Sequence, residues 1–284
     1  MVAQNVCVEA LCNRVLVGIH IMAIAESFAF LRHISEIRTN TINDHRANPS
    51  WVKVTTITIT SSFNNPVNLD VIRAYFAVNK TVYIKTKYSN YKFMWNISDT
   101  SFFNQVSIYC DDHRSRKSVK FFPNGSIQVA GCCDMMDCER VLKQINCVVS
   151  HITHQRMHAV DYTVHMINSN FSLNRYVNLN NIMSAFMAKG HDVTFNPDRY
   201  SAVKIKLKPF NTDRTVTVSI FNSGKIIVTG AKSLVEVSTS YGIIMDIIFS
   251  NMKVLVGQDG PGVDTFQFWR GGKIDNWLEW KKIS

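Results

Sequence analysis

The sequence contains few of the residues that make a chain flexible or disordered. It has only 6 Pro and 12 Gly among 284 residues, and charged residues make up only 18% of it. The scarcity of Pro and Gly excludes long flexible linkers, and the low charge excludes wholesale disorder. Hydrophobic residues make up 46% of the chain, which is ample for a core in one or two domains.

Long apolar runs are also missing. No stretch of about 18 uninterrupted apolar residues occurs, so no membrane span is expected. The most apolar run covers residues 15–31 and is interrupted by His20 and Glu26. It has neither the clear basic start nor the small-residue cleavage site of a signal peptide. We expect a helix there that packs on the core or on a partner.

The cysteines do not form the usual metal or disulfide patterns. Seven are present, with no Cys-x-x-Cys pair. A local group combines four cysteines with three histidines: Cys132, Cys133, Cys138, Cys147, His151, His154 and His158. Its spacing fits no common zinc framework, and a chain with this much core needs no disulfides. We expect reduced thiols in an intracellular protein, with no metal and no cofactor.

Catalytic motifs are absent as well. The sequence shows no paired carboxylates, no nucleophile–base motif and no phosphate-binding glycine loop at a credible place. We therefore expect a protein that is not an enzyme. The net charge of +10 and the pI near 9.3 instead indicate a polyanionic partner. Nucleic acid, a membrane surface and an acidic protein all remain open on charge alone.

An internal repeat organises the chain. Residues 67–76, VNLDVIRAYF, and residues 177–186, VNLNNIMSAF, share Val, Asn, Leu, Ile and Phe at the same offsets. Leu69, Ile72 and Phe76 are spaced three and four apart, which predicts one face of a helix. A second repeated motif comprises residues 122–131, FPNGSIQVAG, and residues 221–230, FNSGKIIVTG, and it predicts a hairpin in each copy.

The remaining elements follow the same order in both copies. Helical patterns follow the hairpins at residues 134–149 and 233–249. An opening strand is expected at 52–62 and again at 162–171. A further strand is expected between helix and hairpin, at 103–110 and 202–208, and in the second of these Val203, Ile205 and Leu207 should point inward.

These patterns divide the chain into four parts. We expect an N-terminal extension at 1–50, a first repeat at 51–155 with an insertion near 83–99, a second repeat at 156–256, and an aromatic C-terminal tail at 257–284. The free face of the sheet would be polar and basic, and four rings would lie at strand ends in matched places of the two repeats: Phe103, Phe122, Tyr200 and Phe221.

Two segments of the second repeat resemble the TATA-box-binding protein (TBP) family. Residues 196–203, NPDRYSAV, are similar to an Asn-Pro-x-Arg-Phe-x-Ala-Val segment of that family. Residues 219–232, SIFNSGKIIVTGAK, resemble its Ile-Phe-x-Ser-Gly-Lys hairpin with Thr-Gly-Ala-Lys. The resemblance covers about residues 51–250 and is stronger in the second repeat. The extra termini and the divergent first repeat resemble versions encoded by large DNA viruses.

This resemblance implies a fold and a binding site. The fold would be α+β, a TBP-like saddle of two pseudo-symmetric repeats whose curved antiparallel sheet carries helices on its convex face. The four rings would kink DNA from the minor groove, as minor-groove wedges do. The expected groove floor is Thr56, Thr58, Gln128, Ala130, Asn168, Ile227 and Thr229. The expected phosphate-binding residues are Arg199, Lys204, Lys206, Lys225 and Lys232.

The first repeat departs from the family pattern at these positions. The residues that correspond to Arg199, Lys206, Lys225 and Lys232 are Phe102, Tyr109, Ser126 and Cys133. Tyr200 replaces a Phe of the family, and neither Thr56 nor Met166 is the Asn that reads the central bases. Arg114, Arg116, Lys117 and Lys120 lie in or beside the first-repeat loop and could compensate for the lost cations.

The resemblance implies a transcription-initiation factor that binds and bends AT-rich promoter DNA. Its partners would be duplex DNA, a transcription-factor-IIB-like protein and RNA polymerase. Its site of action would be the nucleus or, for a viral protein, the viral factory of the host cell and possibly the virion. The missing first-repeat cations keep an alternative open, in which the fold is a protein-interaction module that no longer binds DNA through its sheet.

Overall fold

The computed structural model describes residues 2–45, 47–78, 82–84, 93–98, 102–111, 115–159, 161–210 and 214–259. These residues form two compact units, each containing one copy of the repeat. Unit one comprises the chain up to Ser27 and Thr55–Ile167, and unit two comprises Phe28–Val54 and the chain from Asn168 onward. The repeat boundaries inferred from the sequence stay predictions, and residues 260–284 of the expected aromatic tail lie outside the described part.

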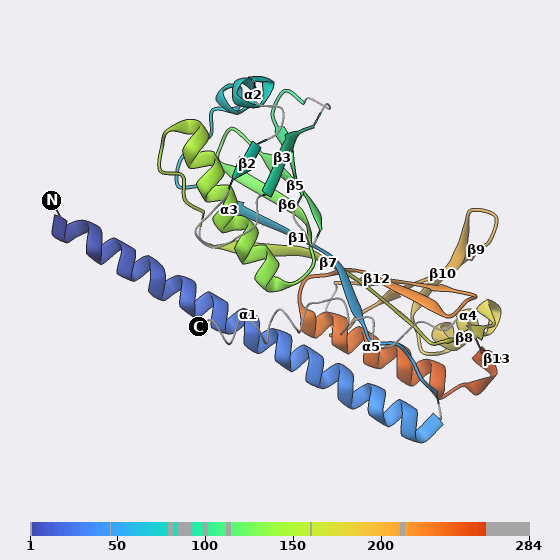
Figure 1. The fold of residues 1–284 in the computed structure, drawn as a ribbon. Coiled ribbons are helices and arrows are strands. Elements are labelled where there is room, and N and C mark those ends of the chain that lie inside the picture. Colours follow the sequence, from blue (N-terminus) through green and yellow to red (C-terminus); the bar gives the residue numbers. More distant parts are fainter. Residues whose placement is uncertain are drawn as a thin grey trace. The chain divides into compact units, whose positions relative to one another are not determined.

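Unit one is a sheet with two helices of its own. Its sheet has the order β2-β3-β4-β5-β6-β1-β7, with the first half of β7 at its edge. Its elements are β1 (Lys53–Ser62), α2 (Leu69–Val78), β2 (Val82–Ile84), β3 (Phe93–Ile97), β4 (Val106–Asp111), β5 (Arg116–Phe121), β6 (Ser126–Cys132), α3 (Met135–Thr153) and β7 (Tyr162–Ser172). Parts of β2 and β3 come from the expected insertion near 83–99. Figure 1 shows α3 lying along this sheet.

Unit two repeats the plan. The second half of β7 continues into the order β7-β12-β11-β10-β9, and β13 pairs with β8 in a separate two-stranded sheet. Its further elements are β8 (Arg175–Val177), α4 (Leu179–Ala188), β9 (Asp192–Asn196), β10 (Tyr200–Leu207), β11 (Val216–Phe221), β12 (Lys225–Ala231), α5 (Leu234–Phe249), the 3-10 helix η1 (Met252–Val254) and β13 (Leu255–Asp259).

The repeated Val-Asn-Leu sequence has a structural cause. The side chain of Asn68 accepts a hydrogen bond from the backbone N–H of Asp70 at 3.0 Å, and Asn178 accepts one from Asn180 at 3.0 Å. Both asparagines therefore cap the first turn of a helix, where the N–H groups have no partner within the helix. The repeated Leu then begins the buried stripe of α2 or the first turn of α4.

The second repeated motif is a hairpin turn. Gly125 and Gly224 donate their N–H groups to the carbonyls of Phe122 and Phe221, at 3.0 and 2.9 Å. Both glycines have positive φ, +88° and +76°, a region that other residues rarely adopt. The predicted hairpins β5–β6 and β11–β12 follow from this turn.

The core of each unit lies between the sheet and its long helix. In unit two, Val203, Ile205 and Leu207 are fully buried, which confirms the predicted alternation. In unit one, Ile57, Ile59 and Val129 play the same part. Apolar burial of this kind is worth about 25 cal/mol per Å² and is the main stabilising term in such a fold.

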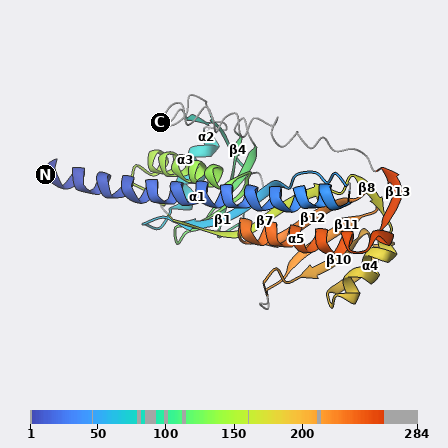
Figure 2. The same cartoon turned by 90° about the horizontal axis from the view of Figure 1, so that it is seen from below.

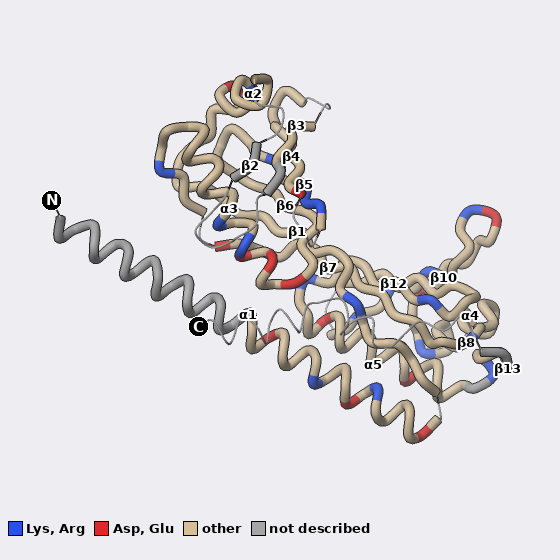
Figure 3. The backbone as a smooth tube through the Cα atoms, viewed as in Figure 1, with Lys and Arg blue, Asp and Glu red and all other residues tan. Residues whose placement is uncertain are grey.

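A long N-terminal helix, α1 (Val2–His45), covers α5 within unit two. Figures 1 and 2 show the second half of α1 running beside α5. Phe30 and Ile34 are buried, and the His33 ring nitrogen Nδ1 lies 2.9 Å from the Ser238 hydroxyl oxygen. Figure 3 shows charges of both signs along this segment. Arg32 and Glu36 form an exposed ion pair at 2.9 Å. No described helix has a stretch apolar enough to cross a membrane.

Candidate nucleic-acid interface

The free face of the unit two sheet is polar and basic. On β10, Lys204 lies opposite Ser219 of β11, and Lys206 lies opposite Thr217. Because side chains alternate along a strand, these lysines point away from the face that buries Val203 and Ile205. The two rows continue across β12 through Ile227 and Thr229, two of the expected groove-floor residues, which are half-buried.

Two rings meet at one end of this face. Tyr200 begins β10 and Phe221 ends β11, and their ring centroids lie 5.8 Å apart at an interplanar angle of 65°. The Lys204 ammonium lies 4.4 Å from the centroid of the Tyr200 ring, a cation–π distance. The structure therefore brings together two of the residues predicted to kink DNA and one predicted to bind phosphate.

The other predicted cations of unit two are exposed. They are Arg199, Lys206, Lys225 and Lys232. Arg199 lies in the turn before β10, Lys225 opens β12, and Lys232 follows it. The Lys206 ammonium donates a hydrogen bond to the Thr217 hydroxyl at 2.8 Å, which holds it over the sheet. Figure 3 shows several Lys and Arg positions in the region of β10 and β12.

The expected groove floor of unit one lies on one sheet face. Thr58 pairs with Ala130 and Thr60 with Gln128, and Ala130 continues to Ser118 of β5. Thr58 is only 7% exposed, so it offers little surface to a ligand. Thr56 in unit one and Asn168 in unit two are half-buried. His165, which the sequence reasoning missed, places its ring nitrogen Nε2 2.8 Å from the Thr60 hydroxyl.

Units one and two each contain a cross-strand pair of lysine and serine on the free face, but the lysine lies on different strands of the pair in the two units. Lys204 pairs with Ser219 in unit two, and at the corresponding place Ser107 of β4 pairs with Lys120 of β5. The polar and charged partners have thus exchanged strands. A sequence alignment of the two repeats compares β4 only with β10. It therefore shows a serine, Ser107, where the second repeat has Lys204, and does not show that Lys120 lies across from it.

A second cation of unit one lies over the position that corresponds to Lys206. That position is Tyr109, and the Arg116 guanidinium carbon lies 4.3 Å from the centroid of its ring. Arg116 also faces the Asp111 carboxylate at 3.8 Å and remains largely exposed. The free face of unit one therefore keeps Arg116 and Lys120, while Arg114 lies outside the described residues.

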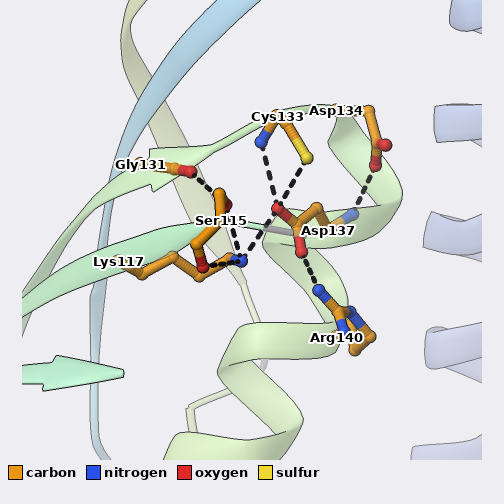
Figure 4. A network of polar contacts seen from close by, with 7 residues as sticks. All are labelled: Ser115, Lys117, Gly131, Cys133, Asp134, Asp137 and Arg140. Atoms are coloured by element: carbon orange, nitrogen blue, oxygen red, sulfur yellow. Dashed lines mark hydrogen bonds and ion pairs between the residues drawn. The ribbon is translucent and has the colours of Figure 1, made fainter. Parts of the chain in front are cut away.

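Lys117 does not belong to this face, which corrects the expectation that it could compensate. It shares the inward side of β5 with Val119 and Phe121, and its side chain is fully buried. Its ammonium lies 3.2 Å from the Asp137 carboxylate, also fully buried, and 3.0 Å from the Ser115 hydroxyl (Figure 4). A cation enclosed in this way cannot reach a phosphate.

The same network explains how α3 begins. The Asp137 carboxylate accepts from the Cys133 N–H at 3.0 Å, contacts Arg140, and its own N–H donates to Asp134 at 2.6 Å. Burial favours the neutral acid, but Lys117 and Arg140 outweigh it and lower the pKa of Asp137. In unit two, Glu236 accepts from the Lys232 N–H at 2.8 Å and pairs with Arg214.

In unit one, the two rings expected to kink DNA differ in exposure and in their place relative to the strands. Phe122 directly follows β5 and is half-buried. Phe103 was expected within a strand at 103–110, but β4 begins only at Val106, and Phe103 lies in the preceding turn. Its side chain is 94% exposed. The turn forms because the Gln105 N–H returns to the Phe102 carbonyl at 3.4 Å.

The cysteines that are described in both backbone and side chain take part in no disulfide: Cys110, Cys132, Cys133, Cys138 and Cys147. Cys132 and Cys138 share a hydrogen bond in the core, which together with burial raises the pKa of Cys138. Within the described part of the chain, no group of three His, Cys, Asp or Glu residues is arranged to hold a metal ion.

Three comparisons with known proteins agree with this geometry. The family model described as "Transcription factor TFIID (or TATA-binding protein, TBP)" matches residues 161–250. A TATA-box-binding protein-like protein of Acanthamoeba polyphaga mimivirus is 24% identical, over 75% of this chain and 69% of its own. The solved Methanococcus jannaschii TBP covers 70% of this chain and 98% of its own, with a TM-score of 0.51 at 17% identity.

The structural match confirms the predicted α+β fold of the TBP type. The family model lies on the repeat that carries the ring pair and the exposed lysines, which is also the repeat with the stronger resemblance in sequence. The family is one of transcription factors and not of enzymes. The chain is therefore similar to the TATA-box-binding protein family, in sequence over residues 161–250 and to a viral relative over most of its length, and it shares the fold of that family.

Proposed function

We propose that this protein binds the minor groove of AT-rich promoter DNA, bends the duplex with inserted aromatic rings, and recruits transcription factors and RNA polymerase. The observation that carries the proposal is the end of the unit two sheet, where Tyr200 and Phe221 lie in ring contact beside Lys204. A partly exposed aromatic pair flanked by cations suits a partner with stacked bases and phosphates.

The free sheet faces of the two units combine uncharged side chains with surrounding cations, which suits such a partner. Small polar and apolar side chains, such as Thr229 and Ile227, leave the centre of the sheet without charge, as a groove floor requires. Cations lie around it in unit two at Lys204, Lys206 and Lys225. In unit one, Arg116 and Lys120 supply the corresponding positive charge. Both repeats therefore take part in gripping DNA.

The recruiting role rests on the family and on the exposed surfaces of the helices. A transcription-factor-IIB-like protein and RNA polymerase would bind the outer helices and loops once DNA is held. If the chain is virus-encoded, this assembly would form in the viral factory of the host cell, and otherwise in the nucleus.

The test is an equilibrium titration of the full chain against AT-rich and GC-rich duplexes of equal length, repeated over a range of salt concentrations. We expect tighter binding to the AT-rich duplex and a strong salt dependence. Each neutralised phosphate contributes about −0.9 to the slope of log K against log salt. Fluorescence transfer between dyes on the duplex ends measures the bend in the same samples.

An absence of binding at low salt, or an affinity that does not change with salt, would overturn the proposal. The fold would then serve as a protein-interaction module whose sheet is filled by a protein segment. A footprint that lies on the duplex but leaves it straight would keep DNA binding and remove bending.

A further inference from the structure

A single arginine on α2 holds the turn that carries Phe103. The Arg73 nitrogen Nη2 donates to the carbonyl oxygens of Phe103 at 3.1 Å, Phe102 at 3.2 Å and Gln105 at 3.4 Å. Its other terminal nitrogen, Nη1, donates to the Asp70 carboxylate at 2.7 Å on the same helix. One guanidinium thus ties the backbone of the whole 102–105 turn to the start of α2.

This arrangement uses what is special about arginine. The guanidinium is planar and always charged, and it presents five N–H donors in a fixed fork. Hydrogen bonds from a charged donor are shorter and stronger than neutral ones. The ion pair with Asp70 leaves the second half of the fork directed at the turn. The Arg73 side chain is 34% exposed, so water screens these contacts only in part.

The two repeats hold their corresponding rings, Tyr200 and Phe103, in position by different contacts. Tyr200 is braced through its ring, by Phe221 and by the Lys204 ammonium. Phe103 is 94% exposed and has few protein atoms around it, so its direction depends on its backbone. The position that corresponds to Arg73 in the second repeat is Met183, which cannot donate to a carbonyl.

We propose that Arg73 is a positioning residue that orders the 102–105 turn and so presents the Phe103 ring to DNA in a fixed place. The inference rests on the proposed function, since the ring needs a fixed direction only if it enters a base step. An aromatic wedge that must first be ordered loses part of its binding free energy to that ordering, and a braced turn avoids this loss.

The first test reads base unstacking directly. A 2-aminopurine placed at either kinked base step fluoresces more strongly when that step unstacks. A step belongs to the first repeat if its fluorescence increase is lost in Phe103→Ala/Phe122→Ala, and to the second repeat if the increase is lost in Tyr200→Ala/Phe221→Ala. In Arg73→Met we expect the signal at the first-repeat step to fall several-fold, toward that of Phe103→Ala. The second-repeat step and the salt slope should not change.

Two variants control this result. Arg32→Met removes an exposed arginine that is paired with Glu36 on α1, and it should change neither step. Arg73→Lys keeps the charge but lacks the fork, so it should restore only part of the signal. Full restoration by lysine, an unchanged signal in Arg73→Met, or equal losses at both steps would each overturn the positioning role.

The second test needs no DNA. Hydrogen exchange of the backbone amides of residues 102–106 should be several-fold faster in Arg73→Met than in the wild-type protein, and unchanged in Arg32→Met. Equal exchange rates in Arg73→Met and wild type would overturn the role of Arg73. If exchange accelerates but the wild-type protein unstacks no step, the DNA-bending function fails while the hold of Arg73 on the turn stands.

Discussion

Lys120 of β5 lies directly across from Ser107 of β4, on the free face of the first repeat. The second repeat has the mirror arrangement, with lysine at 204 on β10 and serine at 219 on β11. With Arg116 over Tyr109, the first repeat keeps two cations where a residue-by-residue alignment predicts none. The two faces should therefore contribute more evenly to DNA binding than the sequence alone indicates.

The first prediction compares the cations of the two faces. Arg116→Ala/Lys120→Ala and Lys204→Ala/Lys225→Ala should each weaken DNA binding and flatten the salt slope by about two units, because each pair removes about two phosphate contacts. The measurement is the affinity as a function of salt concentration.

Lys189→Ala/Lys253→Ala is the matched control, since both lysines are exposed but lie at the end of α4 and in η1. A loss confined to the second-repeat pair would mean that the first repeat does not grip DNA. Losses in neither pair would place the ligand elsewhere and favour the interaction-module alternative.

The second prediction concerns the rings. The Phe122→Ala/Phe221→Ala variant should bind DNA more weakly and bend it much less, because alanine cannot hold a base step open. Fluorescence transfer between the duplex ends gives the bend angle. Tyr200→Phe keeps the ring contact with Phe221 and should keep the bend. A bend that persists in the double variant would show that these rings are not the wedges.

The third prediction concerns the buried pair of Lys117 and Asp137. Lys117→Met or Asp137→Asn should each lower the free energy of unfolding by about 3–5 kcal/mol, because each leaves a charge buried without its full partner. Chemical denaturation followed by circular dichroism measures the loss. Lys120→Met, on the exposed side of the same strand, should change stability by less than about 1 kcal/mol.

The pH dependence of this pair follows from the lowered pKa of Asp137. Its stabilising contribution is complete above the ordinary value of 3.8 and is lost as the pH falls from there toward the lower folded-state pKa. The stability difference between wild type and Asp137→Asn should therefore stay constant near neutral pH and shrink below about pH 4. A difference that grows on acidification would contradict this assignment.

The fourth prediction compares two glycines at equivalent places. Gly131 and Gly230 both have positive φ, +108° and +90°, near the end of β6 and β12. A Cβ added at Gly131 would lie 2.6 Å from the carbonyl oxygen of Arg116, whereas at Gly230 it would meet nothing within 4 Å. Both alanine variants carry backbone strain of about 1–2 kcal/mol, but only Gly131→Ala adds a backbone clash.

Thermal unfolding should therefore show a clearly larger loss of stability for Gly131→Ala than for Gly230→Ala. Equal losses would mean that the backbone around Arg116 can shift to accommodate the added Cβ with little loss of stability. In that case Arg116 would not be held firmly enough to serve as a fixed phosphate contact.

Much of this protein follows from sequence patterns because the interactions behind them are local. Asn68 and Asn178 each accept a hydrogen bond from the N–H two residues further on, and Gly125 and Gly224 each close a four-residue turn. The alternation around Val203 indicates which side of its strand is buried. Local signals of this kind repeat when a unit is duplicated, so comparing the chain with itself revealed both copies.

Only the tertiary structure decided which charges face outward and which strand supplies them. Lys117 and Lys120 are three residues apart on one strand, yet one is enclosed against Asp137 and the other lies on the free face. Arg73 and Phe103 are thirty residues apart, and no sequence pattern links them. These relationships depend on which strands and helices pack together, and a side chain's partner across a sheet or over a turn is set by that packing rather than by its neighbours in the chain.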